Sequence, residues 1–141
     1  MQKILYFEDS VDQILSASDL FDKIKDVDID KTKEHLIAVT LDAKKHIINV
    51  HIISVGILNA SIVHPRELFR PAILDAADSI IVAHNHPSGD PTPSDNDISV
   101  TKTIIAAGKI IGIDVIDHVV FAKDKYISIR ERRYEYNIHD W

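Results

Sequence analysis

The chain has 141 residues, an apolar content of 45% and a net charge of −6, values typical of one compact globular domain with a hydrophobic core. It contains no cysteine, which excludes disulfides, thiolate metal sites and cysteine nucleophiles, so any metal would need imidazole and oxygen ligands. The negative charge argues against a broad nucleic-acid surface, although Arg130, Arg132 and Arg133 leave a local basic patch open. Because the N-terminus resembles no signal peptide and no apolar run approaches about 20 residues, we predict a soluble, cytoplasmic protein that does not enter a membrane.

The first half of the chain predicts a helix, then strands, then a second helix. Apolar spacing from about Ser10 to Lys25 predicts an amphipathic helix or two short ones, with Ser10 as a candidate N-cap. The composition then shifts to Val, Ile and Thr, which predicts three strands: 35–41, 46–56 and 60–63. The next segment predicts a helix with Pro65 in its first turn and an irregularity at Pro71.

The second half begins with a continuous apolar run at 79–84, which predicts a strand buried on both faces. A loop rich in proline, glycine and aspartate follows at 85–93. Apolar spacing from Ser94 to Lys109 predicts a helix whose end is marked by Gly108 and Gly112. The chain closes on a predicted hairpin, with strands at 113–122 and 126–129. The order of elements therefore predicts an α/β (α+β) domain, with one mixed, mostly antiparallel sheet flanked by helices.

The loop after the buried strand carries residues suited to metal binding. His84 and His86 are two positions apart at the end of an extended segment, so both imidazoles can point to the same side. Asp97 lies where the next helix begins, and a proline-stiffened loop could bring it back over the strand end. Two imidazoles and a carboxylate suit a catalytic zinc ion, which keeps one position for water and lowers the pKa of that water. The pattern favours a His84, His86 and Asp97 zinc site.

A purely structural interpretation of the same residues stays open. Ser94 and Asp97 form a capping-box pattern, in which each side chain accepts a hydrogen bond from the backbone N–H of the other residue. A histidine at a strand end is also often a polar residue with an ordinary hydrogen bond. The two interpretations do not compete for Ser94, which can cap the helix and still present its hydroxyl to the site.

The spacing His84-x-His86, seven residues, Ser94, two residues, Asp97 is similar to the JAMM (MPN+) metalloprotease motif. The segments "HNHPSG" and "PSDND" resemble the RadC-like bacterial branch of that family, and the resemblance extends from about Lys33 through Ser128. It implies the JAMM/MPN fold, which is cytidine-deaminase-like. It also implies three parts of the chain: an N-terminal helical extension at 1–30, a RadC-like JAMM/MPN domain at 31–130 and a C-terminal tail at 131–141.

The resemblance implies a zinc-dependent metallopeptidase or isopeptidase that binds Zn2+ through the two histidines and the aspartate of the motif. The family uses a glutamate on an early strand to deprotonate the metal-bound water, and Glu34 occupies the corresponding place. Glu67 is the competing candidate for this general base. Ser94 resembles the family serine that donates a hydrogen bond to the developing oxyanion. The implied substrate is a protein or peptide with an amide or isopeptide bond.

Three other functions fit the sequence less well. The main alternative is a RadC-like accessory or binding module in DNA repair or mobile-element functions. About thirty residues precede the domain and lack the glycine-bearing hairpins of a DNA-binding region, so intrinsic DNA binding is not expected. A nuclease or phosphatase would recruit a second metal or basic residues, whereas the loop holds no Lys or Arg. A zinc nucleobase deaminase needs Cys-x-x-Cys, and the chain has no cysteine.

The remaining polar residues near the motif are predicted to be structural. Asn85, between the two histidines, should face away from the metal and brace the loop. His35, His46 and His51 are predicted to fill surface or core positions. His64 and His118 are also predicted to be structural, with orientation of a metal ligand as the alternative.

Overall fold

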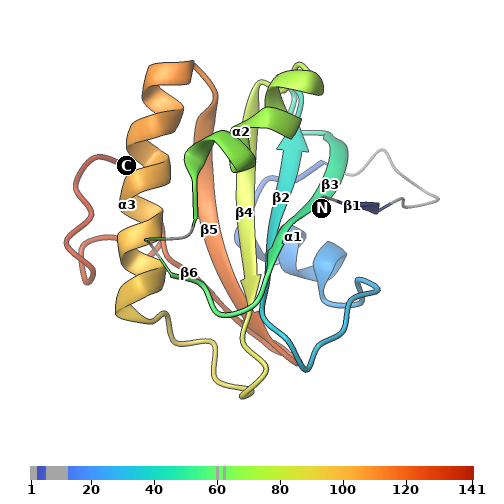
Figure 1. Ribbon diagram of the computed structural model, residues 1–141, viewed down its shortest axis with the longest axis vertical. Coiled ribbons are helices and arrows are strands. Elements are labelled where there is room, and N and C mark those ends of the chain that lie inside the picture. Colours follow the sequence, from blue (N-terminus) through green and yellow to red (C-terminus); the bar gives the residue numbers. More distant parts are fainter. Residues whose placement is uncertain (1–2, 6–12, 60, 62) are drawn as a thin grey trace.

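The described residues of the computed structural model are 3–5, 13–59, 61 and 63–141. In chain order their elements are β1 (Lys3–Leu5), α1 (Ala17–Ile24), β2 (His35–Leu41), β3 (Ile47–Val55), α2 (Pro65–Leu74), β4 (Ser79–Asn85), α3 (Asp95–Ile111), β5 (Asp114–Ala122) and β6 (Lys125–Ser128). The strands form one sheet in the order β1-β3-β2-β4-β5-β6, in which only β4 and β5 are parallel neighbours (Figure 1). The predicted mixed, mostly antiparallel sheet flanked by helices is confirmed.

The sheet is the middle of three layers. Successive residues of a strand point to opposite faces, so each central strand contributes to two hydrophobic cores. In β2, Ile37 and Val39 pack in the core that contains α1, whereas Leu36 and Ala38 pack in the core that contains α2 and α3. Figure 1 shows α2 and α3 on one face of the sheet and α1 on the other. Strands β2 and β4 are buried along their whole length, as expected of strands covered on both faces.

The N-terminal helix is shorter than the periodicity predicted. Helix α1 begins at Ala17 because the Ser16 side chain accepts a hydrogen bond from the Asp19 backbone N–H at 3.1 Å, which caps the first turn. The predicted N-cap at Ser10 lies outside the described residues. Strand β1 was not predicted, and it pairs antiparallel with β3 at the edge of the sheet.

The strand predicted at 60–63 is wrong at the two residues of this segment that the structure describes. Residues 60 and 62 lie outside the described part of the chain, but Ser61 lies in a turn and Val63 outside any strand. The Asn59 side chain accepts hydrogen bonds from the backbone N–H and hydroxyl of Ser61, at 2.9 and 2.8 Å. The Asn59 backbone carbonyl accepts a further hydrogen bond, from the backbone N–H of Val63 at 3.1 Å. These local hydrogen bonds to Asn59 hold the backbone in a turn and outweigh the β propensity of the apolar residues.

The end of α3 depends on two glycines with different roles. Gly112 is the C-cap and has a left-handed backbone with φ of 84°, which a glycine adopts without strain. Gly108, predicted to mark the same end, lies inside the helix and is buried. A Cβ on Gly108 would lie 2.6 Å from the backbone oxygen of Ile113, so this glycine permits close packing instead of ending the helix.

The strand order brings three separate segments to one end of the sheet. The β2 and β4 register pairs Leu36 with His84, and the β4 and β5 register pairs His84 with Val120. The residue before β2, the end of β4 and the loop that leads into α3 therefore meet. No helix in the described part of the chain is long and apolar enough to cross a membrane.

Candidate metal centre

Glu34 and His84 are brought together by the pairing of β2 with β4. Glu34 immediately precedes β2, and its Oε1 atom lies 3.6 Å from His84 Nε2. Glu67, the competing glutamate, lies in the first turn of α2 and is exposed. Among the described residues, the group suited to a metal ion contains Glu34, His84 and His86, with ligand atoms within 4.8 Å of one another. The geometry therefore brings Glu34, and not Glu67, to the histidines.

Asp97 is held at the site by the capping box that opens α3. The Ser94 Oγ atom accepts a hydrogen bond from the Asp97 backbone N–H at 3.1 Å. Asp97 Oδ2 in turn accepts one from the Ser94 backbone N–H at 2.8 Å. The capping box predicted for "SDND" is thus present. It fixes the carboxylate of Asp97, whose side chain is only 1% exposed, at the start of the helix.

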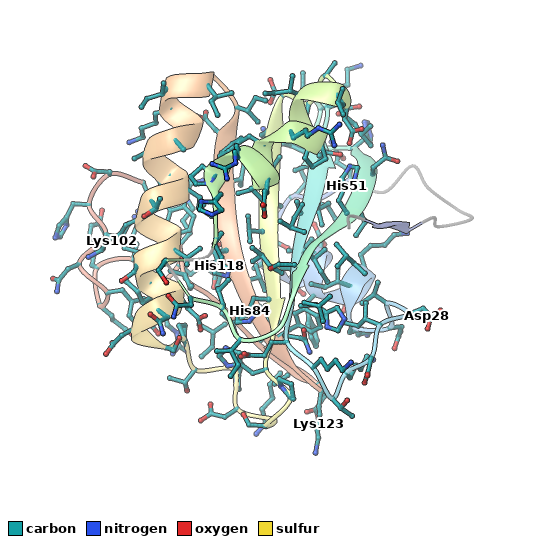
Figure 2. All side chains as sticks on the ribbon, in the orientation of Figure 1. Asp28, His51, His84, Lys102, His118 and Lys123 are labelled. Atoms are coloured by element: carbon teal, nitrogen blue, oxygen red, sulfur yellow. The ribbon has the colours of Figure 1, made fainter. Side chains whose placement is uncertain are left out.

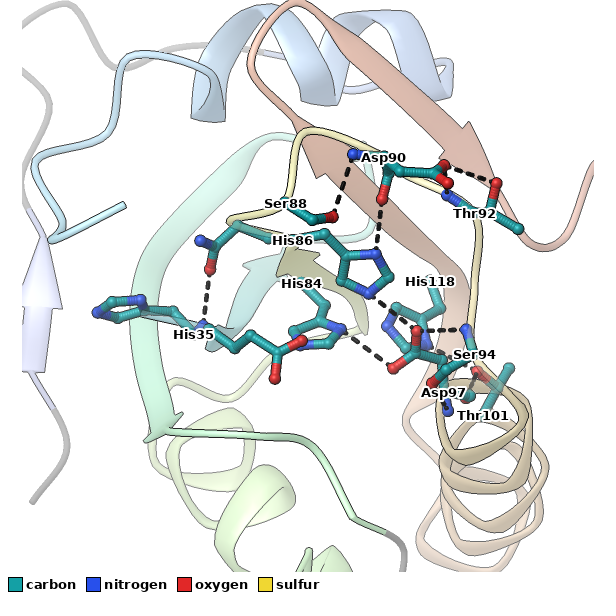
Figure 3. A network of polar contacts seen from close by, with 12 residues as sticks. His35, His84, His86, Ser88, Asp90, Thr92, Ser94, Asp97, Thr101 and His118 are labelled. Carbon is teal, nitrogen blue, oxygen red and sulfur yellow. Dashed lines mark hydrogen bonds and ion pairs between the residues drawn. The ribbon is translucent and has the colours of Figure 1, made fainter. Parts of the chain in front are cut away.

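The Asp97 carboxylate faces both histidines (Figure 3). Its Oδ1 lies 3.2 Å from His84 Nδ1, and its Oδ2 lies 3.0 Å from His86 Nε2. Burial opposes the charged form of Asp97, but the contacts with His84 and His86 outweigh burial and hold the pKa of Asp97 well below its ordinary value. The same contact raises the pKa of His86. Asp97 is therefore a carboxylate at neutral pH.

The loop between β4 and α3 orients His86 through a backbone carbonyl. His86 Nδ1 lies 2.9 Å from the Asp90 carbonyl oxygen, so this ring nitrogen donates and leaves Nε2 directed at Asp97. The loop is braced at Asp90, whose side chain accepts hydrogen bonds from the backbone N–H and hydroxyl of Thr92, at 2.9 and 2.7 Å. Histidines that bind metals commonly donate their other ring nitrogen to a carbonyl or carboxylate. The arrangement of His86 suits a metal ligand.

Buried polar atoms at the centre of the cluster lack hydrogen-bond partners. In the described part of the chain these atoms include both ring nitrogens of His84 and the Oδ1 atom of Asp97. Such atoms are costly to bury unless an ion, a water or another group satisfies them. A zinc ion would satisfy Asp97 Oδ1 and one of the two ring nitrogens of His84, since carboxylate oxygen and imidazole nitrogen are among its usual ligands. The residues present therefore fit the cation that the motif implies.

The two carboxylates of the site differ in exposure. The side chain of Asp97 is 1% exposed, whereas that of Glu34 is 21% exposed. A buried carboxylate fixed by a backbone N–H suits the role of a permanent ligand. A partly exposed carboxylate can meet an incoming substrate or water. The exposed fraction of the side chain thus distinguishes the two acidic groups, although both contact His84.

Asp97 is supported from behind by Thr101, which was not predicted from the sequence, and by His118, predicted to be structural with orientation of a metal ligand as the alternative. The Thr101 hydroxyl donates to the Asp97 carbonyl at 2.6 Å and lies 2.6 Å from His118 Nδ1, which donates to it. Thr101 and His118 are fully buried. Burial and the nearby His84 lower the pKa of His118 to about 3, so His118 is neutral. The i, i+4 spacing of Asp97 and Thr101 on α3 was the local signal, but the contact with His118 depends on the packing of α3 on β5.

Three of the other histidines, and Asn85, make structural contacts. His35 Nδ1 lies 2.9 Å from the Lys33 carbonyl, His46 lies 3.5 Å from Asp42, and His51 lies 2.7 Å from Asp75. His64 is the N-cap residue of α2 and makes no side-chain capping bond. Asn85 braces the segment around Glu34, as described below.

Comparison with known proteins adds a family relationship. Residues 14–134 match the family described as RadC-like JAB domain. A "UPF0758 protein" from Methanococcoides burtonii is 45% identical over 130 residues, which are 92% of this chain and 57% of that protein. A "UPF0758 protein" from Caldanaerobacter subterraneus subsp. tengcongensis is 53% identical over 103 residues, 73% of this chain and 44% of that protein. The chain thus spans about half the length of these relatives, and their names state no activity.

Proposed function

Because the chain belongs to the RadC-like JAB domain family, we propose that it is a zinc-dependent metallohydrolase of the peptidase or isopeptidase type. The observation that carries this proposal is the set of buried, unpartnered atoms where His84, His86 and Asp97 meet, with Glu34 beside them. The proposed ligands are His84, His86 and Asp97. The proposed substrate is a protein or peptide with an amide or isopeptide bond, met in the cytoplasm.

The chain's own residues divide the chemistry of hydrolysis between them. A zinc ion held by the three ligands would supply Lewis acidity and lower the pKa of a bound water toward neutrality. Glu34 accepts a proton from the attacking water and returns it to the leaving amine, a task for which a carboxylate on the open side of the histidines is suited. Asp97 stays ionised and balances the charge of the cation, since its pKa is well below the ordinary value.

Ser94 is the proposed donor to the oxyanion that develops as the carbonyl is attacked. Its Oγ atom accepts from the Asp97 backbone N–H, an interaction that uses an oxygen lone pair and leaves the hydroxyl proton able to donate. Ser94 is exposed at the start of α3, beside the aspartate ligand. Its position therefore supports access to a substrate at the same end of the sheet.

Metal analysis of the purified protein is the first test. We expect about one zinc per chain after zinc loading, because catalytic zinc sites with three protein ligands bind the ion tightly. His86→Ala and Asp97→Ala should each release the zinc, whereas His46→Ala, at a histidine outside the cluster, should retain it. Wild-type protein that stays metal-free after loading would contradict the proposal.

Activity on amide and isopeptide libraries is the second test, with glutamate variants as controls. Glu34→Gln should retain zinc and lose turnover by about 100-fold or more, because general-base catalysis contributes roughly that factor. Glu67→Gln should retain both zinc and turnover. If only Glu67→Gln loses turnover, the general base is Glu67 and not Glu34. If zinc-loaded wild-type protein turns over no amide in the libraries, a RadC-like binding module is the better description.

A further inference from the structure

Asn85 lies between the two histidines in sequence but points to the other face of the sheet. It is 4% exposed, and its side chain contacts the backbone on both sides of Glu34. Its Oδ1 atom accepts a hydrogen bond from the His35 backbone N–H at 2.6 Å. Its Nδ2 atom donates to the Lys33 carbonyl at 2.9 Å. Figure 3 draws the contact at His35 together with the cluster around His84 and Asp97.

These two bonds continue the pairing of β2 with β4 beyond its last backbone pair. The register runs from Leu41 opposite Ser79 to Leu36 opposite His84. Past that pair, the Asn85 side chain replaces a backbone partner and holds the peptide groups on either side of Glu34. On the opposite edge, the Glu34 carbonyl accepts a hydrogen bond from the Gly56 backbone N–H at 2.8 Å. The backbone of Glu34 is therefore held from both neighbouring strands.

The Asn85 backbone is itself held by β5. The β4 and β5 register pairs Asn85 with Phe121, and the His86 backbone N–H donates to the Phe121 carbonyl at 2.9 Å. Asn85 thus connects the backbone between His84 and His86 to the backbone on both sides of Glu34. A shift of Glu34 away from the histidines would break both side-chain bonds of a buried amide.

We propose that Asn85 is a positioning residue that holds Glu34 beside His84 and His86, an inference that rests on the proposed function. The amide supplies one acceptor for the His35 N–H and one donor for the Lys33 carbonyl from the same planar group. Aspartate keeps the acceptor but places a second acceptor against the Lys33 carbonyl. Leucine has the same branching at Cγ and supplies neither.

The two hydrogen bonds from the Asn85 side chain to His35 and Lys33 form a clamp on the backbone of Glu34. This clamp is tested first, without metal or substrate, by backbone amide exchange measured by NMR. In the wild type the His35 amide should exchange slowly, like the amides of β2. In Asn85→Leu, which removes the acceptor of the His35 N–H, His35 exchange should rise about tenfold, the factor that the loss of one hydrogen bond allows, while Ile37 and Val39 change little. Asn85→Asp keeps this acceptor, so His35 exchange should rise less in Asn85→Asp than in Asn85→Leu. Asn96→Asp, the same substitution at an exposed residue of α3, is the matched control and should leave His35 unchanged. A wild-type His35 amide that exchanges like an exposed residue would overturn the clamp, whether or not the variants fold.

The position of Glu34 is tested next, on Co2+-loaded protein with 13C-labelled glutamate. In the wild type and in Asn96→Asp, the Glu34 carboxyl carbon should show strong paramagnetic relaxation, which falls steeply with distance from the ion. Asn85→Asp should bind Co2+ and lose much of this relaxation. Its kcat should fall about 100-fold with an unchanged KM, as expected when a catalytic group is misplaced by about 1 Å.

The outcomes separate the clamp from the proposed function. Unchanged Glu34 relaxation in Asn85→Asp would overturn the positioning role. Wild-type protein that holds Co2+ but turns over no amide would contradict the proposed function, while the relaxation difference would still support the position of Glu34. If the wild type binds no Co2+, the proposed function fails and the positioning role fails with it, because there is then no ion for Glu34 to serve.

Discussion

Asp97 and His118 lie close together in a buried environment that affects their charges differently. Burial disfavours charge on both groups, but two histidines contact Asp97 directly and keep it ionised. The nearby His84 adds to burial at His118 and keeps that imidazole neutral. The site therefore combines a fixed negative charge with a neutral imidazole behind it.

The neutral state of His118 predicts an acid sensitivity of the metal-free protein. The ordinary pKa of histidine is 6.5, and that of His118 is about 3, so between these values the unfolded chain binds a proton that the folded chain does not. Stability should therefore fall as pH decreases below about 6.5, by up to about 1.4 kcal/mol per pH unit from this residue. Urea unfolding in EDTA between pH 6.5 and 4 would measure it. His118→Gln should have a shallower pH dependence than the wild type, and equal slopes would contradict the prediction.

At the scale of elements, α1 and α3 begin with the same capping interaction. Ser16 Oγ accepts from the Asp19 backbone N–H, and Ser94 Oγ accepts from the Asp97 backbone N–H, both at 3.1 Å. The aspartate side chain accepts a backbone N–H in return: at α3 from the N-cap Ser94, which completes a capping box, and at α1 from Leu15, the residue before the N-cap. Of these two aspartates only Asp97 faces histidines, so the cap of α1 serves the helix alone, whereas the capping box of α3 serves the helix and the candidate site.

The two caps provide a matched pair of variants. Ser16→Ala and Ser94→Ala should each lower the free energy of unfolding by about 1 kcal/mol, the usual cost of losing a serine N-cap. Only Ser94→Ala should weaken zinc binding, by about 10-fold or more, because it loosens the backbone that presents Asp97. Urea unfolding and a competitive zinc titration would measure the two effects. Equal zinc affinity in both variants would show that the cap does not position the ligand.

At the scale of the whole molecule, a second polar cluster lies at the other end of β2 from Glu34. Asp75, the C-cap of α2, accepts hydrogen bonds from Thr40 of β2 at 2.7 Å and from Asn49 of β3 at 3.0 Å, and it contacts His51 at 2.7 Å. In Figure 2, His51 is labelled nearer than His84 to the end of the sheet where α2 lies. This cluster attaches α2 to two strands. Burial opposes the charge of Asp75, but its hydrogen bonds outweigh burial and lower its pKa.

The separation of the two clusters predicts that stability and metal binding can be changed independently. Asp75→Asn should lower the free energy of unfolding by about 1–3 kcal/mol at pH 7, because it disrupts a buried hydrogen-bonded cluster. Zinc content should remain at about one per chain. The stability difference from the wild type should shrink as pH falls below 3.8, where the wild-type carboxylate also becomes protonated. Zinc loss in proportion to destabilisation would contradict this independence.

The sequence predicted features that depend on neighbouring residues. The buried strand at 79–84, the capping box of Ser94 and Asp97, and the helix end at Gly112 follow from hydrophobic period, side-chain capping and backbone freedom. The strand predicted at 60–63 failed at Ser61 and Val63 because the side chain of one asparagine captured the backbone, an effect that β propensity does not include. Predictions from local pattern were therefore sound where no competing side-chain contact intervened.

What the sequence determined by itself is the set of chemical groups and their local spacing: two imidazoles two positions apart, and a carboxylate in the first turn of a helix. The tertiary structure decided which glutamate lies beside His84, because this depends on the register of β2 against β4. It also decided that the Asp90 carbonyl orients His86, that His118 supports Thr101 and that Asn85 holds the backbone around Glu34. The physical reason is that backbone conformation responds to residues a few positions away, whereas strand register and layer packing depend on burial summed over the whole core.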